Sequence, residues 1–426
     1  MSRERSFRVG WLVISSWMWH LTRWDGLFLG TYLVTHLGGA AIEDQLVGVA
    51  LFAPMLVGSL VAGQLHKGLN PRTVLLACQV VLIPVAACFA FLVGSGSAEI
   101  WMVYPFEFAF GIGGMLNMTA QRELLARAAG PQRQRRVLSA ELTGLSSAMM
   151  LGPLLGGISI GVIGLGPAFV PLVALLACSV TILAAARSPA SAAAEPVAPA
   201  AQPGQPAPGR PAAATRRNLR HLLHYRQLAL VLGVTVVANL CYFSFMPLVP
   251  EVAKRLHAGP AMAGVLGSAA GAVQLVVAAA LVAWPARRAS AAFAAAVGLC
   301  LVCLGALAYA PDAVVAVPIL ATAGIGQGFF NSLQTLLAVD SVPHSDRPAA
   351  LGALTTTIGV ALPLGMLVLG IGSSLLGTQA GMLVSALAGI TALAVIAVLN
   401  RRTISGAGGD EGDQAAPVPP EPLRMF

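Results

Sequence analysis

Two acidic side chains and one arginine lie inside long apolar stretches of the chain. Arg23 and Asp25 stand within the stretch near 9–37, and Glu107 stands within the stretch near 100–120. A carboxylate that faces lipid costs at least about 2.5–3.5 kcal/mol, so such groups face a cavity or a partner. Burial favours the neutral carboxyl group, whereas a neighbouring guanidinium favours the charged form. Groups balanced in this way can carry a proton across a membrane, and we predict that these three residues form a buried proton-coupling cluster.

The same residues also allow a purely structural interpretation. An Arg–Asp or Arg–Glu pair can pin two helices together without changing its protonation. Glu107 is about seven residues, or roughly 10 Å, from the outer end of its stretch, so its side chain could also extend to the membrane surface. Replacing Glu107 by Gln separates these hypotheses. If the carboxyl group carries the proton, the variant should fold normally and lose proton-driven transport.

Amide and aromatic side chains in the other apolar stretches are candidates for contact with a solute. Gln327, Asn331 and Gln334 are spaced by four and three residues, which places them on one face of a helix. Hydrogen bonding between helices is the alternative role for each amide. Because charges are few and small side chains are many, we expect an amphiphilic and largely uncharged solute. The candidates for the cavity wall are Trp24, Tyr104, Asn117, Asn239, Tyr242, Gln274, Gln327, Asn331 and Gln334.

The composition indicates that lipid is the solvent of this chain. Of its 426 residues, 57% are hydrophobic and 10% are charged, and the mean hydropathy is +0.80. A soluble domain has about 25% charged residues. The net charge of +8 does not indicate a nucleic-acid partner, because the basic residues lie in connections between apolar stretches. Cys300 and Cys303 form a single CxxC pair inside an apolar stretch, so we expect them to pack helices and expect no metal site.

Twelve apolar stretches are long enough to cross a bilayer, which takes about 20 residues of helix. They lie near 9–37, 44–65, 73–94, 100–120, 138–163, 166–186, 227–249, 260–283, 291–310, 313–338, 351–376 and 379–399. With twelve crossings, all Lys and Arg residues except Arg23, Lys254 and Arg255 fall on the side of the two termini. The positive-inside rule makes this side cytoplasmic. We therefore predict a multi-pass protein of the cytoplasmic (inner) membrane with both termini in the cytoplasm.

A stretch rich in alanine and proline divides the chain. Residues 188–225 lack apolar periodicity, and we predict a disordered cytoplasmic linker there. Residues 403–426 have a similar composition and are predicted to form a disordered cytoplasmic tail. The remaining segments, residues 1–187 and 226–402, are predicted to be two six-helix halves.

The two halves resemble one another at a nearly constant spacing. GIGGMLNMTAQRELL begins at Gly111, and GIGQGFFNSLQTLL begins at Gly324, 213 residues later. The same offset from Arg72 leads to a position beside Arg287. Because each half has an even number of crossings, both repeats have the same orientation. We predict an all-α membrane protein of twelve transmembrane helices in two pseudo-symmetric six-helix bundles, with a solute site at the midplane between them.

The fifth apolar stretch contains the sequence GPLLGG, with Gly152, Pro153, Gly156 and Gly157, and Gly144 lies upstream. Glycines four residues apart let helices approach closely, and a proline permits a bend. The sequence resembles the GPxxGG motif of the major facilitator superfamily, which is found in its exporters and is largely missing from its importers. Ordinary packing of small residues is the alternative interpretation.

The connection after the second stretch resembles another motif of this family, GxLaDrxGrR. It keeps Gly63, Leu65 and Arg72, whereas Lys67 replaces the aspartate and Asn70 replaces a later glycine. In the family that aspartate pairs with basic groups and latches one conformation. Its loss puts this latch in doubt here, while the position of the loop still supports the fold.

The fourth stretch departs from the family in the sign of a buried charge. Glu107 stands four residues before Gly111, where the family normally has an arginine. The likeness covers both halves, roughly residues 8–402. Within the family it points to the branch of bacterial exporters that includes enterobactin and macrolide efflux proteins.

The resemblance implies a secondary active transporter that works by alternating access. We expect proton-coupled efflux of a small amphiphilic molecule, such as a drug, a siderophore or another secondary metabolite. The expected partners are the solute, protons and the lipid bilayer, the expected state is a monomer, and no cofactor is expected beside the proton gradient. The sequence has no ATP-binding loop and no hydrolase motif, which argues against an enzyme. A proton-coupled uptake permease and a non-transporting sensor are the alternatives.

Overall fold

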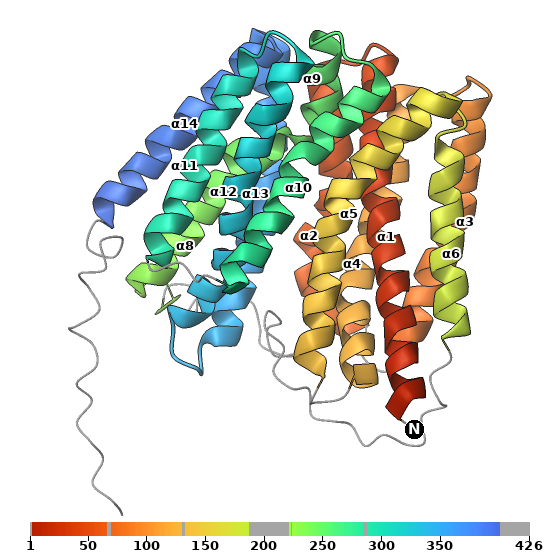
Figure 1. Cartoon of the computed structure of the whole chain (residues 1–426), viewed down its shortest axis with the longest axis horizontal. Helices are drawn as coiled ribbons and strands as arrows, with labels where there is room; N and C mark the ends of the chain where they lie inside the picture. Colours follow the sequence, from red (N-terminus) through yellow and green to blue (C-terminus); the bar gives the residue numbers. More distant parts are fainter. Residues whose placement is uncertain are drawn as a thin grey trace, which may run out of the picture.

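The fold is all-helical in the part of the chain that the computed structural model describes, residues 2–65, 70–129, 133–186, 221–222, 224–283 and 288–400. These ranges contain twelve membrane-length helical segments, the seventh of them broken (Figure 1), which confirms the predicted architecture. The first half contains α1 (Ser2–His36), α2 (Ala41–Leu65), α3 (Pro71–Gly94), α4 (Ile100–Ala129), α5 (Gln134–Ile163) and α6 (Phe169–Ala185). The second half contains α8 (Arg226–Val237), η1 (Ala238–Tyr242), η2 (Phe243–Leu248), α9 (Val249–Arg255), α10 (Pro260–Ala283), α11 (Ala289–Ala308), α12 (Ala313–Asp340), α13 (Arg347–Leu376) and α14 (Thr378–Leu399).

Most helix ends lie within four residues of the ends of the apolar stretches, and the departures are the start of α1 at Ser2, the end of α9 at Arg255 and, largest, the end of α4. The fourth stretch was expected to end near residue 120, but α4 continues to Ala129. Its added turns carry charged side chains, and Arg127 forms an ion pair with Glu123 one turn earlier. Such i,i+4 pairs stabilise a helix in water, so the helix continues beyond the apolar run.

Matching glycines end equivalent helices of the two halves. Gly164 follows α5 and Gly377 follows α13, and both have a φ angle of 87°. In this left-handed region a Cβ atom is unfavourable, which is why glycine ends helices in this conformation. The two positions are 213 residues apart, the offset that relates the repeats in the sequence. The duplication is therefore visible in the backbone itself.

The two halves lie side by side, and the contacts between them reach from one end of the bundle to its middle. We call the end at which α1 begins and α14 finishes the proximal end, and the opposite end the distal end (Figure 1). At the distal end α10 packs on α5 and α13 packs on α2. Hydrogen bonds also link the halves there, from Gln45 Nε2 to the Ser244 carbonyl (2.9 Å) and from the Ile42 amide to Ser374 Oγ (2.9 Å). The ribbons of the halves diverge toward the proximal end (Figure 1), and the hydrogen bonds and close contacts described above close the bundle at the distal end.

The seventh segment is broken where a single helix was predicted. The α-helix α8 passes into the π-helical turn η1 and the 3-10 turn η2 before α9 begins. Proline supplies no backbone N–H, and Pro247 and Pro250 lie in this region. Two carbonyl groups of the break are bonded from other helices, Cys241 O by Ser385 Oγ (2.9 Å) and Ser244 O by Gln45. The hydropathy pattern missed the break because the stretch is apolar throughout.

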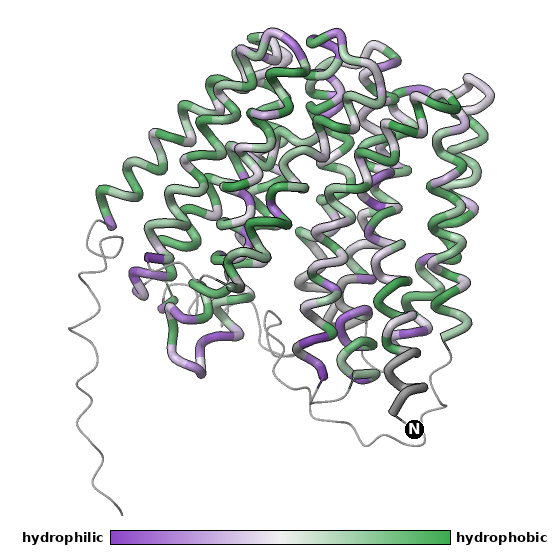
Figure 2. The backbone as a smooth tube through the Cα atoms, in the orientation of Figure 1, coloured by the Kyte–Doolittle hydropathy of each residue, from purple (hydrophilic) through white to green (hydrophobic). Residues whose placement is uncertain are grey.

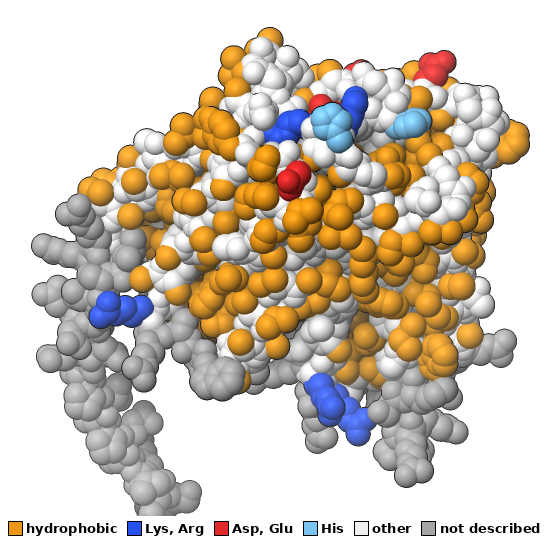
Figure 3. Space-filling view, turned by 45° about the horizontal axis from the view of Figure 1, so that its top comes forward, with side chains coloured by type: hydrophobic (Ala, Val, Ile, Leu, Met, Phe, Trp, Pro, Cys, Tyr) orange, Lys and Arg blue, Asp and Glu red, His pale blue; other side chains and the backbone are white. Residues whose placement is uncertain are grey.

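The surface has the distribution of side chains expected in a bilayer. Eight of the described helical segments are long and apolar enough to span a membrane, and α6 is a shorter apolar helix. Hydrophilic segments gather at the two ends of the bundle, with a few inside it (Figure 2). On the face drawn in Figure 3, apolar side chains form a broad belt, and the charged side chains lie above and below it. Lipid can solvate this belt without leaving backbone polar groups unbonded, because the spans are helical.

Several predictions concern residues that the structure does not describe. The predicted linker 188–225 is described only at residues 221, 222, 224 and 225, and the predicted tail 403–426 lies outside entirely. Lys67 also lies outside the described residues. Gly63 belongs to α2, in a part whose side-chain packing is not described.

Candidate solute cavity and buried charges

A small cavity of about 50 Å³ lies between the two halves. The first half lines it with α1 and α5, and the second half lines it with η2, α9, α10 and α12. The lining residues are Trp24, Leu27, Phe28, Thr31, Met149, Pro153, Phe245, Met246, Val249, Leu266, Gly267, Ala270, Gly271, Gln274, Leu320 and Gln327. The wall is therefore apolar, with a few polar groups, as in sites for small organic molecules.

Three of the predicted wall residues line this cavity, namely Trp24, Gln274 and Gln327. Gln327 is held in place from behind, because its Nε2 donates a hydrogen bond of 2.8 Å to the hydroxyl of Tyr242. Tyr242 is 1% exposed and belongs to the π-helical turn η1. The break in the seventh segment thus positions the tyrosine that orients a cavity amide.

The other predicted wall residues lie elsewhere in the described structure. Asn239 donates to the Thr235 carbonyl (2.9 Å), and Gln334 donates to Thr235 Oγ1 (3.1 Å). Asn117 is buried, and neither of its amide atoms has a hydrogen-bond partner among the described residues. Asn331 is exposed. Of the three residues predicted to share one face of α12, Gln327 lines the described cavity, whereas Asn331 and Gln334 do not.

Tyr104, the remaining predicted wall residue, lies on the first half near the acidic side chains Glu43 and Asp44. These acids belong to the first turn of α2, close to the distal end. Tyr104 does not belong to the described lining of the cavity. Its aromatic ring packs against the core of the first half instead.

Asp25 lies against the GPLLGG sequence of α5. An added Cβ atom at Gly156 would come within 2.8 Å of Asp25 Oδ1, and one at Gly152 would come within 2.7 Å of the Asp25 amide nitrogen. Any side chain at either glycine would therefore push α1 away from α5. Asp25 is 2% exposed, and its Oδ1 has no hydrogen-bond partner within the described part of the chain. The glycines bring a buried, unbonded carboxyl oxygen into the seam between α1 and α5.

The same motif also forms the contact with the second half. An added Cβ at Gly157 would lie 2.7 Å from the Cα of Gly264 in α10, and one at Gly264 would lie 2.6 Å from the Pro153 carbonyl oxygen. Gly144, upstream, lies beside Trp17 with room for a Cβ at 3.5 Å. Adjacent glycines of α5 thus face different neighbours, Asp25 on one side and the second half on the other.

Glu107 and Arg23 occupy another side of α1. Glu107 is completely buried, and its Oε1 would lie 3.0 Å from a Cβ added at Gly30 and 3.7 Å from one at Gly26. Neither carboxyl oxygen has a hydrogen-bond partner among the described residues. The Arg23 guanidinium packs against Gly114 of α4, and the two opposite charges attract one another.

Arg23 makes no ion pair within 4.0 Å among the described residues, and its guanidinium carbon lies 5.3 Å from the centre of the Phe52 ring. A helix turns by about 100° per residue, so Arg23 and Asp25 point roughly 200° apart. The three charges proposed as one cluster are thus arranged as two groups. Arg23 and Glu107 lie between α1 and α4, whereas Asp25 faces α5.

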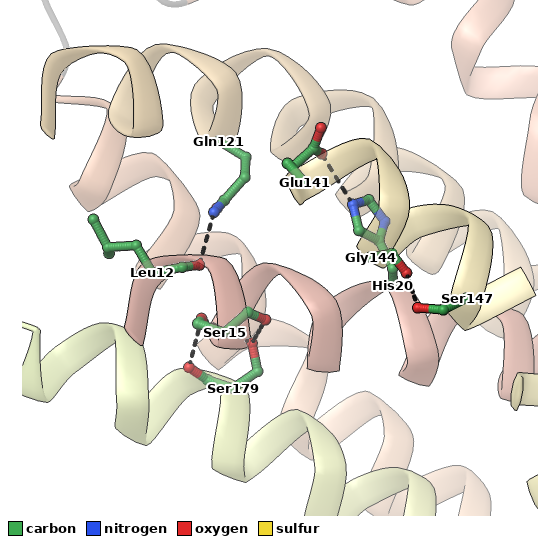
Figure 4. Close-up of polar contacts among 8 residues, drawn as sticks. All are labelled: Leu12, Ser15, His20, Gln121, Glu141, Gly144, Ser147 and Ser179. Atoms are coloured by element: carbon green, nitrogen blue, oxygen red, sulfur yellow. Dashed lines mark hydrogen bonds and ion pairs between the residues drawn. The ribbon is translucent and has the colours of Figure 1, made fainter. Parts of the chain in front are cut away.

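Two further buried acids were not among the residues predicted from the sequence. Asp44 is fully buried in the first turn of α2, where its Oδ1 accepts a hydrogen bond from Thr35 Oγ1 (3.0 Å). Glu141 is 4% exposed in α5, and its Oε1 lies 3.3 Å from Nε2 of His20 in α1 (Figure 4). Both acids stand within four residues of the start of an apolar stretch, so hydropathy alone did not separate them from the connections.

Arg72, the last residue of the GxLaDrxGrR-like loop, caps a helix. Its guanidinium donates to the carbonyl oxygens of Leu183 (3.1 Å) and Ala184 (2.7 Å) in the last turn of α6. A cation at a helix C-terminus also interacts favourably with the helix dipole. Asn70, which replaces a family glycine, caps α3 by accepting from the Arg72 amide (3.0 Å). This loop therefore fixes the ends of two neighbouring helices.

The comparison with protein families identifies the chain. The family model described as Major Facilitator Superfamily matches residues 25–345 and 231–426, which together cover nearly the whole chain. The chain belongs to the Major Facilitator Superfamily. Its members are transporters and not enzymes, and they work on small solutes across membranes. No curated protein sequence matches the chain.

Solved structures of this superfamily share the fold at low sequence identity. A bacterial homologue of the human lysosomal transporter Spinster, in an inward-facing and unoccupied conformation, has a TM-score of 0.70 at 13% identity, over 95% of this chain and 98% of the other. The nucleoside transporter NupG has a TM-score of 0.66 at 16% identity, over 92% and 98%. A POT family transporter in complex with 5-aminolevulinic acid has a TM-score of 0.69 at 11% identity, over 93% and 96%. At these identities the likeness concerns the fold alone.

Proposed function

We propose that this member of the superfamily is a proton-coupled exporter of small, amphiphilic and largely uncharged molecules. It acts as a monomer in the cytoplasmic membrane, with its proximal end toward the cytoplasm, and it resembles the enterobactin and macrolide exporter branch. The proton gradient is its energy source. The closed distal end then corresponds to a state in which the cavity faces the cytoplasm, where an exporter collects its solute.

The proposal depends mainly on one observation, the contact between Asp25 and Gly156. Gly156 meets the buried carboxyl group, and its neighbour Gly157 meets Gly264 in the second half. A change in the charge of Asp25 alters the free energy of burying it in this seam, since a charged carboxylate is expensive there. The same helix, α5, forms the distal contact between the halves. Proton binding and opening of the distal contact are thereby linked through α5.

The cavity supports the proposed class of solute. Its described lining has no charged side chain, and its largest members include Trp24, Phe28 and Phe245. Gln274 and Gln327 supply amide groups that can orient a polar substituent. A charged solute would lose its hydration here without a compensating partner, which costs several kcal/mol or more. An uncharged amphiphile can place its apolar part against the aromatic side chains and its polar part against the two amide groups.

Glu107 and Arg23 have a separate role in this proposal. Both lie on the α4 side of α1 and belong to neither the described cavity wall nor the distal contact. A buried pair of opposite charges can fix the rotation of α1, which aims Asp25 at α5. The carboxyl group of Glu107 remains the second candidate for the coupled proton.

Transport in membrane vesicles tests the proposal. A resistance and secretion profile of a deletion strain first identifies the solute. Inside-out vesicles with an acid interior should then accumulate that solute, and Asp25→Asn should abolish the accumulation while leaving exchange of solute across the membrane without a gradient. Glu107→Gln in the same assay shows whether the second carboxyl group is also required. Proton-driven uptake into whole cells, with no accumulation in the vesicles, would instead establish a permease.

A further inference from the structure

A second titratable pair, His20 and Glu141, lies in the same seam as Asp25. The imidazole comes from α1 and the carboxyl group from α5, with 3.3 Å between His20 Nε2 and Glu141 Oε1. The two side chains are 10% and 4% exposed. His20 Nδ1 and Glu141 Oε2 are both buried and have no hydrogen-bond partner in the described part of the chain. Figure 4 shows the pair between the two helices, beside Gly144 and Ser147.

The chemistry of the pair suits a single proton. With one proton shared, it is neutral, either as imidazole and carboxylic acid or as imidazolium and carboxylate. Without that proton it is an imidazole beside a carboxylate, with a net charge of −1. The two forms differ by one proton and one charge, so the pair can store a proton without creating a net positive charge in the bundle.

Among the side chains that the structure describes, no third charged group pairs with His20 or Glu141 within 4.0 Å. The described charged groups with contacts to α1 include Glu107 of α4, Asp44 of α2 and Lys254 of α9, and these contacts lie elsewhere along that helix. Glu107 faces Gly26 and Gly30, Asp44 is bonded to Thr35 Oγ1, and Lys254 Nζ lies 3.4 Å from the Thr35 carbonyl. α6 meets this part of α1 through Ser179, which bonds to Ser15.

The helices α4 and α10, which pack on α5, also contribute no described ion-pair partner to Glu141. On α4, Glu123 and Arg127 pair with one another, and Gln121 donates to the Leu12 carbonyl (3.2 Å). α10, which also packs on α5, has no acidic, basic or histidine residue in its sequence. Among the described residues, His20 and Glu141 make an ion-pair contact only with each other.

The position of the pair links Asp25 to the proximal end. His20 precedes Asp25 by five residues, or about 7.5 Å along the helix axis. Glu141 lies near the proximal start of α5, which begins at Gln134. From the proximal end inward, the seam between α1 and α5 therefore contains Glu141, His20 and then Asp25. Trp17 closes the seam beside them, since its Nε1 donates to Ser147 Oγ (2.9 Å).

We propose that His20 and Glu141 form a second proton-binding site, which receives the proton given up by Asp25 and releases it at the proximal end. In this step the Asp25 carboxylic acid loses its proton and becomes a carboxylate, while the pair gains the proton and becomes neutral. The pair then returns the proton to water at the proximal end and regains its charge of −1. This inference depends on the proposed role of Asp25 in proton coupling.

Infrared spectroscopy of the full-length protein in lipid vesicles tests the site with the proton itself as the ligand. The carboxyl C=O bands of Asp25 and Glu141 are assigned by their loss in Asp25→Asn and Glu141→Gln. In the wild type the Glu141 band should titrate with pH, and His20→Asn should move the midpoint of that titration by at least one pH unit. Glu123→Gln, which removes a half-buried carboxyl group of α4 that is paired with Arg127, should leave that midpoint in place. A Glu141 band that is the same from pH 5 to pH 9 in the wild type would show a purely structural pair and overturn the inference.

A pH jump tests the relay step. After the jump, loss of the protonated Asp25 band should be slower by a factor of ten or more in His20→Asn and in Glu141→Gln than in the wild type. Glu141→Asp, which keeps a carboxyl group, should recover much of the rate. Equal rates in all variants would refute the relay. If the Asp25 band itself does not titrate, the proposed proton coupling fails, while the titration of the Glu141 band still decides the pair.

Discussion

A disulfide across the distal contact should lock the transporter in the closed-distal state. An ideal Cβ atom at Gly161 of α5 lies 3.6 Å from the Cβ of Ala261 in α10. Disulfides join Cβ atoms about 3.5–4.5 Å apart, with a mean near 3.8 Å. Gly161→Cys with Ala261→Cys therefore meets the geometry without movement of the backbone. The bond joins the two halves at the contact that must separate for the cavity to open distally.

The expected effect is loss of transport under oxidising conditions and its recovery on reduction. The disulfide holds the two Cβ atoms within about 4.5 Å, which is too short for a solute-sized opening between α5 and α10. Transport should fall at least tenfold in proportion to the cross-linked fraction, measured by mass spectrometry of the intact protein. The exposed native cysteines Cys88 and Cys178 are first replaced by serine, so that they do not form other cross-links.

A matched pair within one half serves as the control. An ideal Cβ at Gly305 of α11 lies 3.6 Å from the Cβ of Ala386 in α14, and both helices belong to the second half. Gly305→Cys with Ala386→Cys should form its disulfide and keep transporting. If the completely cross-linked pair at Gly161 and Ala261 also transports at the wild-type rate, the α5–α10 contact is not a gate and the reasoning is wrong.

Two substitutions test the seam and the cavity. Gly156→Ala places a Cβ 2.8 Å from Asp25 Oδ1, and it should lower the free energy of unfolding by about 1–3 kcal/mol and reduce transport. The control, Gly161→Ala, has its nearest contact at 3.6 Å and should be close to neutral. A thermal unfolding assay compares the two variants. Gln327→Leu removes the amide that donates to the buried Tyr242 hydroxyl and should cost about 1–3 kcal/mol, because that oxygen loses a hydrogen bond. Adding Tyr242→Phe should recover most of that loss, and a double variant no more stable than Gln327→Leu would show that the hydrogen bond does not support the cavity wall.

The helical spans could be read from the sequence because the bilayer imposes a local rule. Backbone groups in lipid must be bonded within their own segment, so a sufficiently long apolar run becomes a helix whatever surrounds it. The repeat was also accessible, since duplicated sequence keeps duplicated turns, as Gly164 and Gly377 show. The break in the seventh segment could not be predicted from the sequence. The stretch around Pro247 is hydrophobic overall, and the carbonyl groups in the break accept hydrogen bonds from helices far away in the sequence.

The charged residues show which properties of a buried side chain can be predicted from the sequence and which depend on the packing of the helices. Their presence in apolar stretches marked Asp25, Glu107 and Arg23 as unusual, and the spacing of Arg23 and Asp25 already implied that they point in different directions. Which helix each one meets depends on how α1 is rotated and packed, a property of the assembled bundle. The pairing of His20 with Glu141 is of the same kind, since it joins residues that are 121 positions apart.

Hydropathy and duplication act along the chain, and they already indicate twelve membrane crossings in two related halves. Three features follow only from the tertiary structure: Asp25 faces the glycines of α5, Glu107 of α4 faces Gly26 and Gly30 of α1, and the halves are closed distally. Those features arise from close approach between helices, and such contacts depend on shape in three dimensions.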